Sequence, residues 1–223
     1  MNAPLWRWGD PVAPLQSLLA RGGVLAFPTE SSYGLGADPR NPAGVEAVYR
    51  IKVREAGKPL PVVVSGREQL ADLGVDPNLY IVECLLEHWP APLSGVLPIA
   101  RPSPLLPASA GTGTLAVRVP DHEQLRGLLA EIGHGLTATS ANRSGEEPIL
   151  DPAEAARWLA GVAGQDAVLV DGGVLPGGPP STLVAIEGER LVVLRAGRFP
   201  AERLMETFAR SSTGESRYET SKN

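Results

Sequence analysis

The sequence predicts a single α/β domain in which helices pack around one twisted, mixed sheet. Segments with helical apolar spacing alternate with short apolar runs that are typical of strands, and this alternation continues along the chain. Two alternating segments on either side of Gly188 predict an antiparallel hairpin, so the sheet is not purely parallel. With 223 residues, of which 43% are hydrophobic, the chain can bury a sizeable core. We assign residues 1–210 to the domain and expect residues 211–223, which lack apolar periodicity, to be disordered.

Local signals predict the elements of the first half of the chain. Apolar spacing predicts a helix over Val12–Ala20, which a Gly-Gly pair ends. The apolar run Val24–Phe27 predicts a buried strand, and Pro28 ends it because proline has no N–H to donate to a ladder. An Asn-Pro pair at residues 41–42 predicts the start of a helix that continues to Lys52. Three further elements are expected, namely a strand over Pro61–Ser65 and helices over Arg67–Leu73 and Pro77–Trp89.

The second half of the chain continues the alternation. Residues 101–113, rich in Pro, Ser and Gly, predict a loop. Asp121 is expected to cap a helix that runs through Ile132, with Gln124 in the capping-box position. The other predicted strands are Gly95–Ala100, Thr114–Val119, Leu136–Thr139, Ala167–Val170, Thr182–Ile186 and Leu191–Leu194, and the other predicted helices are Asp151–Val162 and Pro200–Ala209.

Composition limits the classes of function. The net charge of −5 argues against an extended nucleic-acid-binding surface. The single cysteine, Cys84, excludes an intrachain disulfide and suits a reducing compartment. The N-terminus has neither the basic region nor the long apolar run of a signal peptide, and no apolar stretch is long enough to span a bilayer. We therefore expect a cytoplasmic protein that does not associate with membranes.

A dense polar stretch follows the strand predicted at residues 24–27. It consists of Thr29, Glu30, Ser31, Ser32 and Tyr33, whose side chains can all form hydrogen bonds, and glycines follow at positions 34 and 36. A strand that stops in such a cluster is typical of the way α/β proteins present a site at a sheet edge. The alternative interpretation is an ordinary serine-rich turn.

Lysine is rare in this chain, which makes its positions informative. The 20 basic residues include only three lysines, and two of them, Lys52 and Lys58, lie within seven residues of each other. Lysine is a compact point charge and arginine a planar fork, so a lysine kept in an arginine-rich chain indicates a role such as phosphate binding. Lys52 and Arg54 also stand at the C-terminal end of a predicted helix. Stabilisation of that end by cations is the alternative interpretation.

The polar groups at the strand ends favour one class of chemistry. The chain has neither a GxxxxGK[ST] motif nor a GxGxxG motif after a strand, and its three histidines lack a metal-gathering spacing, so no protein metal site is predicted. The strand ends carry the cations Lys52, Arg54, Arg118 and Arg195 without a histidine or cysteine nucleophile. This inventory suits a reaction driven by positioning and charge neutralisation, such as phosphoryl or nucleotidyl transfer.

Seven groups of segments then point to a known family. In chain order they are PTESSYGLG, IKVR with KPL, WPAPLS, LAVRVPDH, ATSANRSGEEP, PSTLV and VLRAG. Together they resemble the YrdC-like threonylcarbamoyl-adenylate synthase family over about residues 23–200. The resemblance implies the YrdC-like fold, which is similar to that of DHBP synthase. Nothing after Pro200 is expected to supply the additional C-terminal domain of the long form, so the chain resembles the short form.

The resemblance implies a nucleotidyltransferase that joins L-threonine, bicarbonate and ATP into threonylcarbamoyl-adenylate and releases pyrophosphate. This reaction is the first step toward the t6A modification next to the anticodon of tRNA. The implied partners are therefore downstream threonylcarbamoyl-transferase proteins, with at most a weak contact to tRNA itself. Mg²⁺ is the implied cofactor, and it would arrive with ATP and bridge phosphate oxygens with few protein ligands of its own.

The matching motifs also imply site residues. For ATP the resemblance implies Lys52, Arg54, Lys58, Thr114, Ser140, Asn142 and Arg195. For threonine it implies Thr29, Ser31, Tyr33, Arg118, Ala138 and Ser181. Lys52 and Arg54 are expected to be catalytic because they can stabilise the charge that builds on the phosphates. Arg118 can hold a carboxylate through two parallel hydrogen bonds.

The chain departs from the family pattern at a few positions. Ser31 replaces a threonine, and Lys58 and Val63 stand where some members have asparagine and histidine. These departures raise the hypothesis of an altered amino-acid pocket, or of a paralogue with a different acyl acceptor. Two further alternatives are a double-stranded-RNA-binding module for ribosome maturation and a carbamoyl-transferring relative of a hydrogenase-maturation domain. The negative charge argues against the first, and the lack of cysteine pairs argues against the second.

Overall fold

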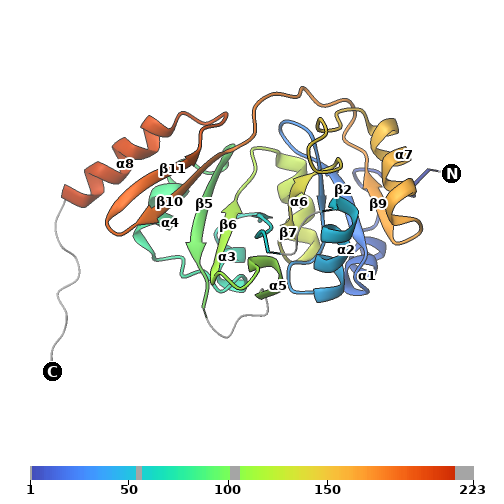
Figure 1. The fold of residues 1–223 in the computed structure, drawn as a ribbon, viewed down its shortest axis with the longest axis horizontal. Coiled ribbons are helices and arrows are strands. Elements are labelled where there is room, and N and C mark those ends of the chain that lie inside the picture. The colour runs from blue at the N-terminus through green and yellow to red at the C-terminus, as the bar shows by residue number, and fades with distance from the viewer. Residues whose placement is uncertain (1, 54–56, 101–105, 214–223) are drawn as a thin grey trace.

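Two mixed sheets with helices packed around them form the framework of the molecule (Figure 1). The computed structural model describes residues 2–53, 57–100 and 106–213. Single-domain α/β architecture is confirmed, but the one mixed sheet that the sequence predicts is divided into a five-stranded and a six-stranded sheet. The division depends on pairings between segments distant in the chain, which local sequence patterns do not contain.

The first sheet has the strand order β1-β9-β2-β3-β8. The strands β1, β9 and β2 run parallel to one another, and β3 runs antiparallel to both β2 and β8. Every residue of β2 is buried, which explains why this strand has a continuous apolar sequence and does not alternate. The strand bounds are Leu5–Trp6 for β1, Val24–Pro28 for β2, Tyr33–Gly36 for β3, Thr139–Ser140 for β8 and Ala167–Val170 for β9.

The second sheet has the strand order β11-β10-β5-β6-β4-β7. It contains the predicted antiparallel hairpin, β10 with β11, and β10 also pairs in parallel with β5. Side chains of β6 alternate, so that Leu115 and Val117 enter the core while Thr114, Ala116 and Arg118 face the opposite side. The strand bounds are Val62–Val63 for β4, Leu93–Pro98 for β5, Thr114–Arg118 for β6, Leu136–Thr137 for β7, Thr182–Glu187 for β10 and Arg190–Arg195 for β11.

Helices cover the sheets, and their caps follow local chemistry. The Asn41 side chain accepts hydrogen bonds from the N–H groups of residues 43 and 44, and Asp151 caps α7 in the same way, as predicted. The helices are α1 (Ala13–Ala20), α2 (Pro42–Lys52), α3 (Glu68–Asp72), α4 (Tyr80–Leu86), α5 (Leu106–Ser109), α6 (Glu123–Ile132), α7 (Pro152–Ala163) and α8 (Ala201–Thr213).

Several predicted boundaries are wrong, each for a physical reason. His122, not Asp121, caps α6, because the His122 backbone is extended and its ring Nδ1 accepts the N–H of Leu125 at 3.1 Å. The predicted helix 77–89 begins only at Tyr80, since Asp76 and Asn78 form a hydrogen-bonded turn before it. The predicted loop 101–113 contains the short helix α5.

The C-terminal end also differs from the sequence prediction. Helix α8 extends to Thr213 and so includes residues 211–213 of the segment predicted to be disordered. An amphipathic helix that already packs through Leu204 and Phe208 needs no further apolar residue to continue for one more turn. The rest of the predicted tail, residues 214–223, lies outside the described residues.

The segment that contains β7 and β8 crosses directly from one sheet to the other. The predicted strand Leu136–Thr139 is divided at Ala138 into β7 and the start of β8, which continues to Ser140 in the predicted loop. The two strands belong to different sheets, since β7 pairs with β4 and β8 pairs with β3. The N–H of Ala37 donates to Thr137 Oγ1 at 2.9 Å, and the N–H of Thr137 donates to the carbonyl of Ala37 at 2.9 Å. A β-carbon on Gly36 would lie 1.8 Å from the carbonyl oxygen of Thr137. The junction therefore requires a glycine at position 36.

We expect Gly36→Ala to lower the free energy of unfolding by about 3 kcal/mol, because the backbone at the junction must move to admit a methyl group. Urea unfolding of the purified protein measures this change. Gly127→Ala is a matched control, since Gly127 lies inside α6 with no atom within 4 Å of the added β-carbon. That control should gain about 0.5–1 kcal/mol from helix propensity. Equal stabilities of the two variants would contradict the role given to the junction.

Candidate active site

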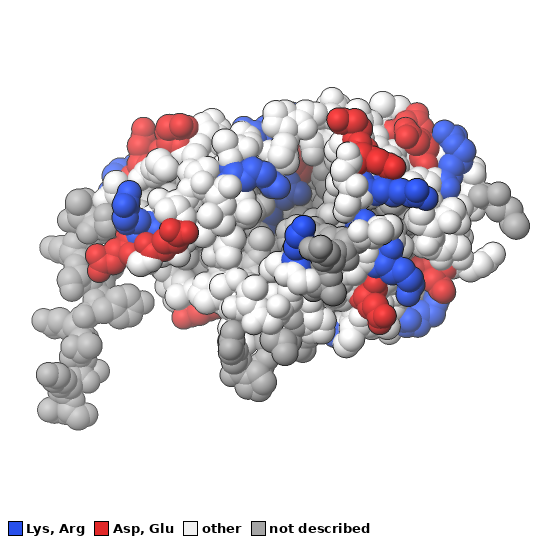
Figure 2. All heavy atoms as spheres, viewed as in Figure 1, with Lys and Arg blue, Asp and Glu red and all other residues white. Residues whose placement is uncertain are grey.

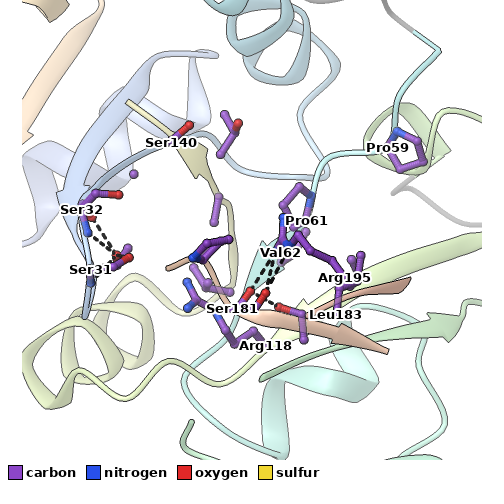
Figure 3. Close-up of a pocket in the computed structure, with 18 of the residues that line it drawn as sticks. Ser31, Ser32, Pro59, Pro61, Val62, Arg118, Ser140, Ser181, Leu183 and Arg195 are labelled. Atoms are coloured by element: carbon purple, nitrogen blue, oxygen red, sulfur yellow. Dashed lines mark hydrogen bonds between the residues drawn. The ribbon is translucent and has the colours of Figure 1, made fainter. Parts of the chain in front are cut away.

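A cavity of about 470 Å³ opens between the two sheets. One side comes from β3 and β8 of the first sheet, and the other comes from β4, β5, β6, β10 and β11 of the second (Figure 3). In the space-filling view this face of the molecule is hollowed, with Lys and Arg side chains around the hollow (Figure 2). Nine residues proposed from the sequence line the cavity, namely Thr29, Ser31, Tyr33, Thr114, Arg118, Ala138, Ser140, Ser181 and Arg195.

A second cavity of about 450 Å³ adjoins the first and shares Thr139 and Ser140 with it. Lys52, Lys58 and Asn142 line this second cavity, so twelve of the thirteen residues proposed from the sequence lie on two contiguous cavities. The thirteenth, Arg54, lies outside the described residues. Thr114 and Arg195, proposed with the nucleotide set, lie in the first cavity together with the residues proposed for threonine.

Lys52 binds the segment that separates the two cavities. Its ammonium group donates to the carbonyl oxygens of Ser140 and Asn142, each at 2.7 Å, and to Asn142 Oδ1. Lys52 is only 3% exposed, and an ammonium group that is removed from water must have its three N–H groups satisfied. Ser140 Oγ donates to the same Asn142 Oδ1 at 2.7 Å. Three residues proposed from two motifs thus form one hydrogen-bonded unit.

The polar stretch after β2 forms a tight turn whose centre is Thr29. Thr29 Oγ1 donates to the carbonyl of Ser32 at 2.7 Å and accepts the N–H groups of Ser31 and Ser32 at 3.3 Å. The alternative interpretation of this stretch as a serine-rich turn is therefore correct for the backbone. The same turn places Ser31 and Ser32 on the cavity lining (Figure 3). Tyr33, at the start of β3, belongs to a strand and not to the loop that the sequence predicts.

Tyr33 supports the cavity wall through its hydroxyl group. The hydroxyl donates to the carbonyl of Gly173 at 2.9 Å and accepts the N–H of Gly172 at 3.0 Å. Burial raises the pKa of this phenol, the Gly172 N–H opposes the rise, and the nearby carboxylates Asp171 and Asp151 add to it. The phenol therefore stays protonated and remains a donor across the physiological pH range.

Arg118 forms an ion pair with Glu30, a residue that the sequence analysis did not propose for the site. Arg118 Nη1 contacts Glu30 Oε1, and the two side chains are 13% and 10% exposed. Burial lowers the pKa of the Arg118 guanidinium, the Glu30 carboxylate opposes this effect, and the charge of Arg195 adds to it. The second carboxylate oxygen, Glu30 Oε2, is buried and has no hydrogen-bond partner among the described residues.

Ser94 is a second residue that the sequence analysis missed. Its hydroxyl lies 2.9 Å from that of Ser181, and both line the first cavity. Arg195 donates to the carbonyl of Ser181 through Nε at 3.1 Å and Nη2 at 2.8 Å (Figure 3). Strand alternation was the signal that could have identified Ser94, since Val96 of the same strand also faces the cavity. The departure at Val63 lies on this cavity as well, where Val63 is 1% exposed.

The described residues contain no group of three or more His, Cys, Asp and Glu side chains that could gather a metal ion. In the same part of the chain no helix is both long enough and apolar enough to cross a bilayer. The polar groups of the described residues that line the two cavities are cations, hydroxyl groups, the Asn142 amide and one carboxylate, that of Glu146.

Two adjoining cavities, with lysines in one and two arginines with hydroxyl groups in the other, define a class of α/β protein with a polar, cation-bearing site between two sheets. A family model of Sua5, YciO and YrdC proteins, described as "Telomere recombination", matches residues 17–197. The chain belongs to this Sua5/YciO/YrdC family.

Individual relatives agree with this placement. Threonylcarbamoyl-AMP synthase of Bacillus subtilis (strain 168) is 35% identical over 197 residues, which are 87% of this chain and 56% of that protein. Threonylcarbamoyl-AMP synthase of Thiobacillus denitrificans is 36% identical over 170 residues, which are 76% of this chain and 88% of that protein. The chain thus spans little more than half of the first relative and most of the second.

Solved structures extend the comparison to the fold. P. abyssi Sua5, whose crystal structure contains L-threonine, superposes with a TM-score of 0.80 at 28% identity, covering 93% of this chain and 61% of that chain. E. coli YciO superposes with a TM-score of 0.75 at 22% identity, covering 92% of this chain and 100% of that chain, and this likeness concerns the fold alone.

We expect Lys52→Met to loosen the segment between the cavities, because the carbonyls of Ser140 and Asn142 lose a buried donor. In hydrogen–deuterium exchange, amides of residues 140–146 should exchange at least about tenfold faster than in the wild type. Lys58→Met is the matched control, since Lys58 is exposed on the same cavity and the charge change is identical. An unchanged exchange rate at residues 140–146 in Lys52→Met would show that Lys52 does not hold the segment.

Proposed function

We propose that this protein is a threonylcarbamoyl-AMP synthase, which uses L-threonine, bicarbonate and ATP and releases pyrophosphate. The observation that carries the proposal is the pair of contiguous cavities that meet at Ser140. One presents the lysines and Asn142, and the other presents Arg118 among hydroxyl groups. A triphosphate needs the first kind of surface, and a small hydroxy-amino acid needs the second. The relatives with this activity support the same assignment.

In this proposal the second cavity receives the β- and γ-phosphates. Lys52, Lys58 and Arg54 offset their charge, and Asn142 and Ser140 supply neutral donors and acceptors. Thr114 and Arg195, which lie in the first cavity, contact the rest of the nucleotide. Ser140 borders both cavities, so the α-phosphate belongs beside it. Lys52 and Arg54 are the catalytic residues of the proposal, because two cations can stabilise the charge that builds on the leaving pyrophosphate.

The amino-acid subsite of the proposal consists of Arg118 with the hydroxyl groups of Ser31 and Ser181. The Arg118 guanidinium binds the threonine carboxylate, and a serine hydroxyl forms a hydrogen bond with the hydroxyl group of threonine. Ala138 leaves room for a side chain, while Thr29 and Tyr33 hold the wall through the hydrogen bonds described above. The threonine seen in P. abyssi Sua5 supports a subsite for this amino acid in the same fold.

The proposed reaction has two steps. First, the neutral amine of threonine attacks the carbon of CO₂ or bicarbonate, forming a C–N bond and an N-carboxylate. With bicarbonate a C–O bond breaks and the hydroxide leaves as water with the amine proton, and with CO₂ that proton passes to solvent. Second, a carboxylate oxygen attacks the α-phosphate, and the bond from that phosphorus to the β-bridging oxygen breaks. The electron pair leaves with pyrophosphate. No covalent enzyme intermediate is required, which agrees with a site whose described residues supply charge and position and no activated nucleophile.

Mg²⁺ enters this proposal as part of the nucleotide substrate. It would bridge phosphate oxygens and complete its coordination with water, because Mg²⁺ keeps several waters and needs few protein ligands. We further propose that the protein acts in the cytoplasm, delivers its product to threonylcarbamoyl-transferase proteins for tRNA modification and contacts tRNA weakly at most.

The direct test is pyrophosphate release by the purified protein. The proposal predicts release that requires ATP, bicarbonate and L-threonine together, with Lys52→Ala folded but slowed by at least about 100-fold in kcat. Circular dichroism and thermal unfolding establish that the variant remains folded. Threonine-independent release would overturn the proposed function, and near-normal turnover by Lys52→Ala would overturn the proposed role of Lys52.

Arg118→Gln should raise the KM for threonine by at least about tenfold while changing the KM for ATP far less, because only the carboxylate of threonine loses its partner. Steady-state kinetics with one substrate varied at a time measures the two constants. Equal increases in both would place Arg118 outside the amino-acid subsite.

A further inference from the structure

The first cavity carries more positive charge than a small amino acid requires. The charged residues among its described lining are Arg118 and Arg195, and they lie close enough for the charge of one to lower the pKa of the other. Hydroxyl groups of Ser31 and Ser181 accompany them. Two arginines with hydroxyl groups are a phosphate-binding inventory, and a free phosphate or the end of a triphosphate would suit it.

Glu30 offsets part of this positive charge, although its side chain does not line the cavity. Its carboxylate pairs with Arg118, but Glu30 does not line the cavity and its side chain is only 10% exposed. Solvent therefore screens this negative charge little, and it cancels most of the Arg118 charge that a ligand in the cavity experiences. Glu30 comes from the turn after β2, whereas Arg118 ends β6, so the pair also spans the two sheets.

The geometry of the pair is not the one that maximises stability. Arginine and a carboxylate bind most strongly through two parallel hydrogen bonds, yet here a single contact joins Nη1 to Oε1. Glu30 Oε2 is left buried without a partner among the described residues, which is unfavourable. The Arg118 guanidinium carries five N–H groups. Those that do not contact Glu30 remain available to a ligand in the cavity.

We propose that Glu30 determines the ligand class of the amino-acid subsite: by neutralising Arg118 it lets the subsite take the single carboxylate of a zwitterion and reject multiply charged phosphates. The inference rests on the proposed function and deepens it. Glu30 acts through Arg118, and it is a specificity-determining residue without contact to the substrate. The division keeps the triphosphate at the lysine-lined second cavity and leaves the Arg118 subsite for the amino acid.

The test is calorimetric titration of the protein with L-threonine, with and without inorganic phosphate at matched ionic strength. For the wild type we expect roughly 10 mM phosphate to change the apparent Kd for threonine by less than about twofold, because phosphate and threonine occupy different places. For Glu30→Gln, which keeps the shape and removes the charge, phosphate should compete and raise that Kd by at least about fivefold.

Three further variants make the outcome decisive. Glu30→Met, a neutral residue of different chemistry, should show the same competition and serves if Glu30→Gln fails to fold. Glu30→Asp keeps the charge and should resist phosphate as the wild type does. Glu87→Gln is the matched control, because Glu87 pairs with Arg210 on the exposed surface at 3.9 Å and loses the same charge there. A merely structural Glu30 would lower stability in the neutral variants without creating competition by phosphate.

The two proposals fail in different ways. If the wild type does not bind threonine at all, the proposed function is wrong. If the wild type binds threonine and phosphate leaves the Kd unchanged in both neutral variants, the function stands and the role of Glu30 is refuted.

Discussion

The buried contact between the Lys52 ammonium group and the carbonyls of Ser140 and Asn142 joins three parts of the molecule. Lys52 ends α2, and the segment that it binds begins at Ser140, the last residue of β8. Only Ala138 separates β8, in the five-stranded sheet, from β7 in the six-stranded sheet. A charge that is buried this far is tolerated only if its donors are satisfied. Lys52 therefore fixes three parts of the molecule relative to one another, namely the end of α2, the crossing between the sheets and the partition between the two cavities. The partition between the cavities therefore has a fixed position, which an exposed loop without such a buried contact would not have.

This arrangement separates two kinds of charge within a short distance. Lys52 and Lys58 border the second cavity, while the buried pair of Arg118 and Glu30 leaves the far end of the first cavity with little net charge from these two residues. Such a division suits a reaction between a polyanion and a zwitterion, because the charge that complements a triphosphate and the charge that complements a zwitterion lie at different cavities. Holding two reactants side by side then supplies much of the rate enhancement without a nucleophile from the protein.

The fold was predictable where local chemistry determines it. The caps at Asn41 and Asp151 and the buried strand β2 follow from residue type and short-range pattern, and the structure contains all three. The strand β3 did not follow, because a segment with two glycines after a polar run is typical of a loop. It becomes a strand only by pairing with β2 and β8, which no local pattern records. Division of the sheet into two has the same non-local origin.

In the candidate site, too, local sequence patterns do not identify every important residue. Residues such as Ser140 and Asn142 were identified through recognisable motifs, and the structure brings them to contiguous cavities. Glu30 lies in one of those motifs and was still missed, because its importance depends on a partner 88 residues away in the chain. A carboxylate in a polar turn has many ordinary explanations, and only its burial beside Arg118, with one oxygen unpaired among the described residues, separates it from them. Sequence motifs thus identify groups that line the cavities, whereas a group that sets the charge of the cavity lining emerges only from packing.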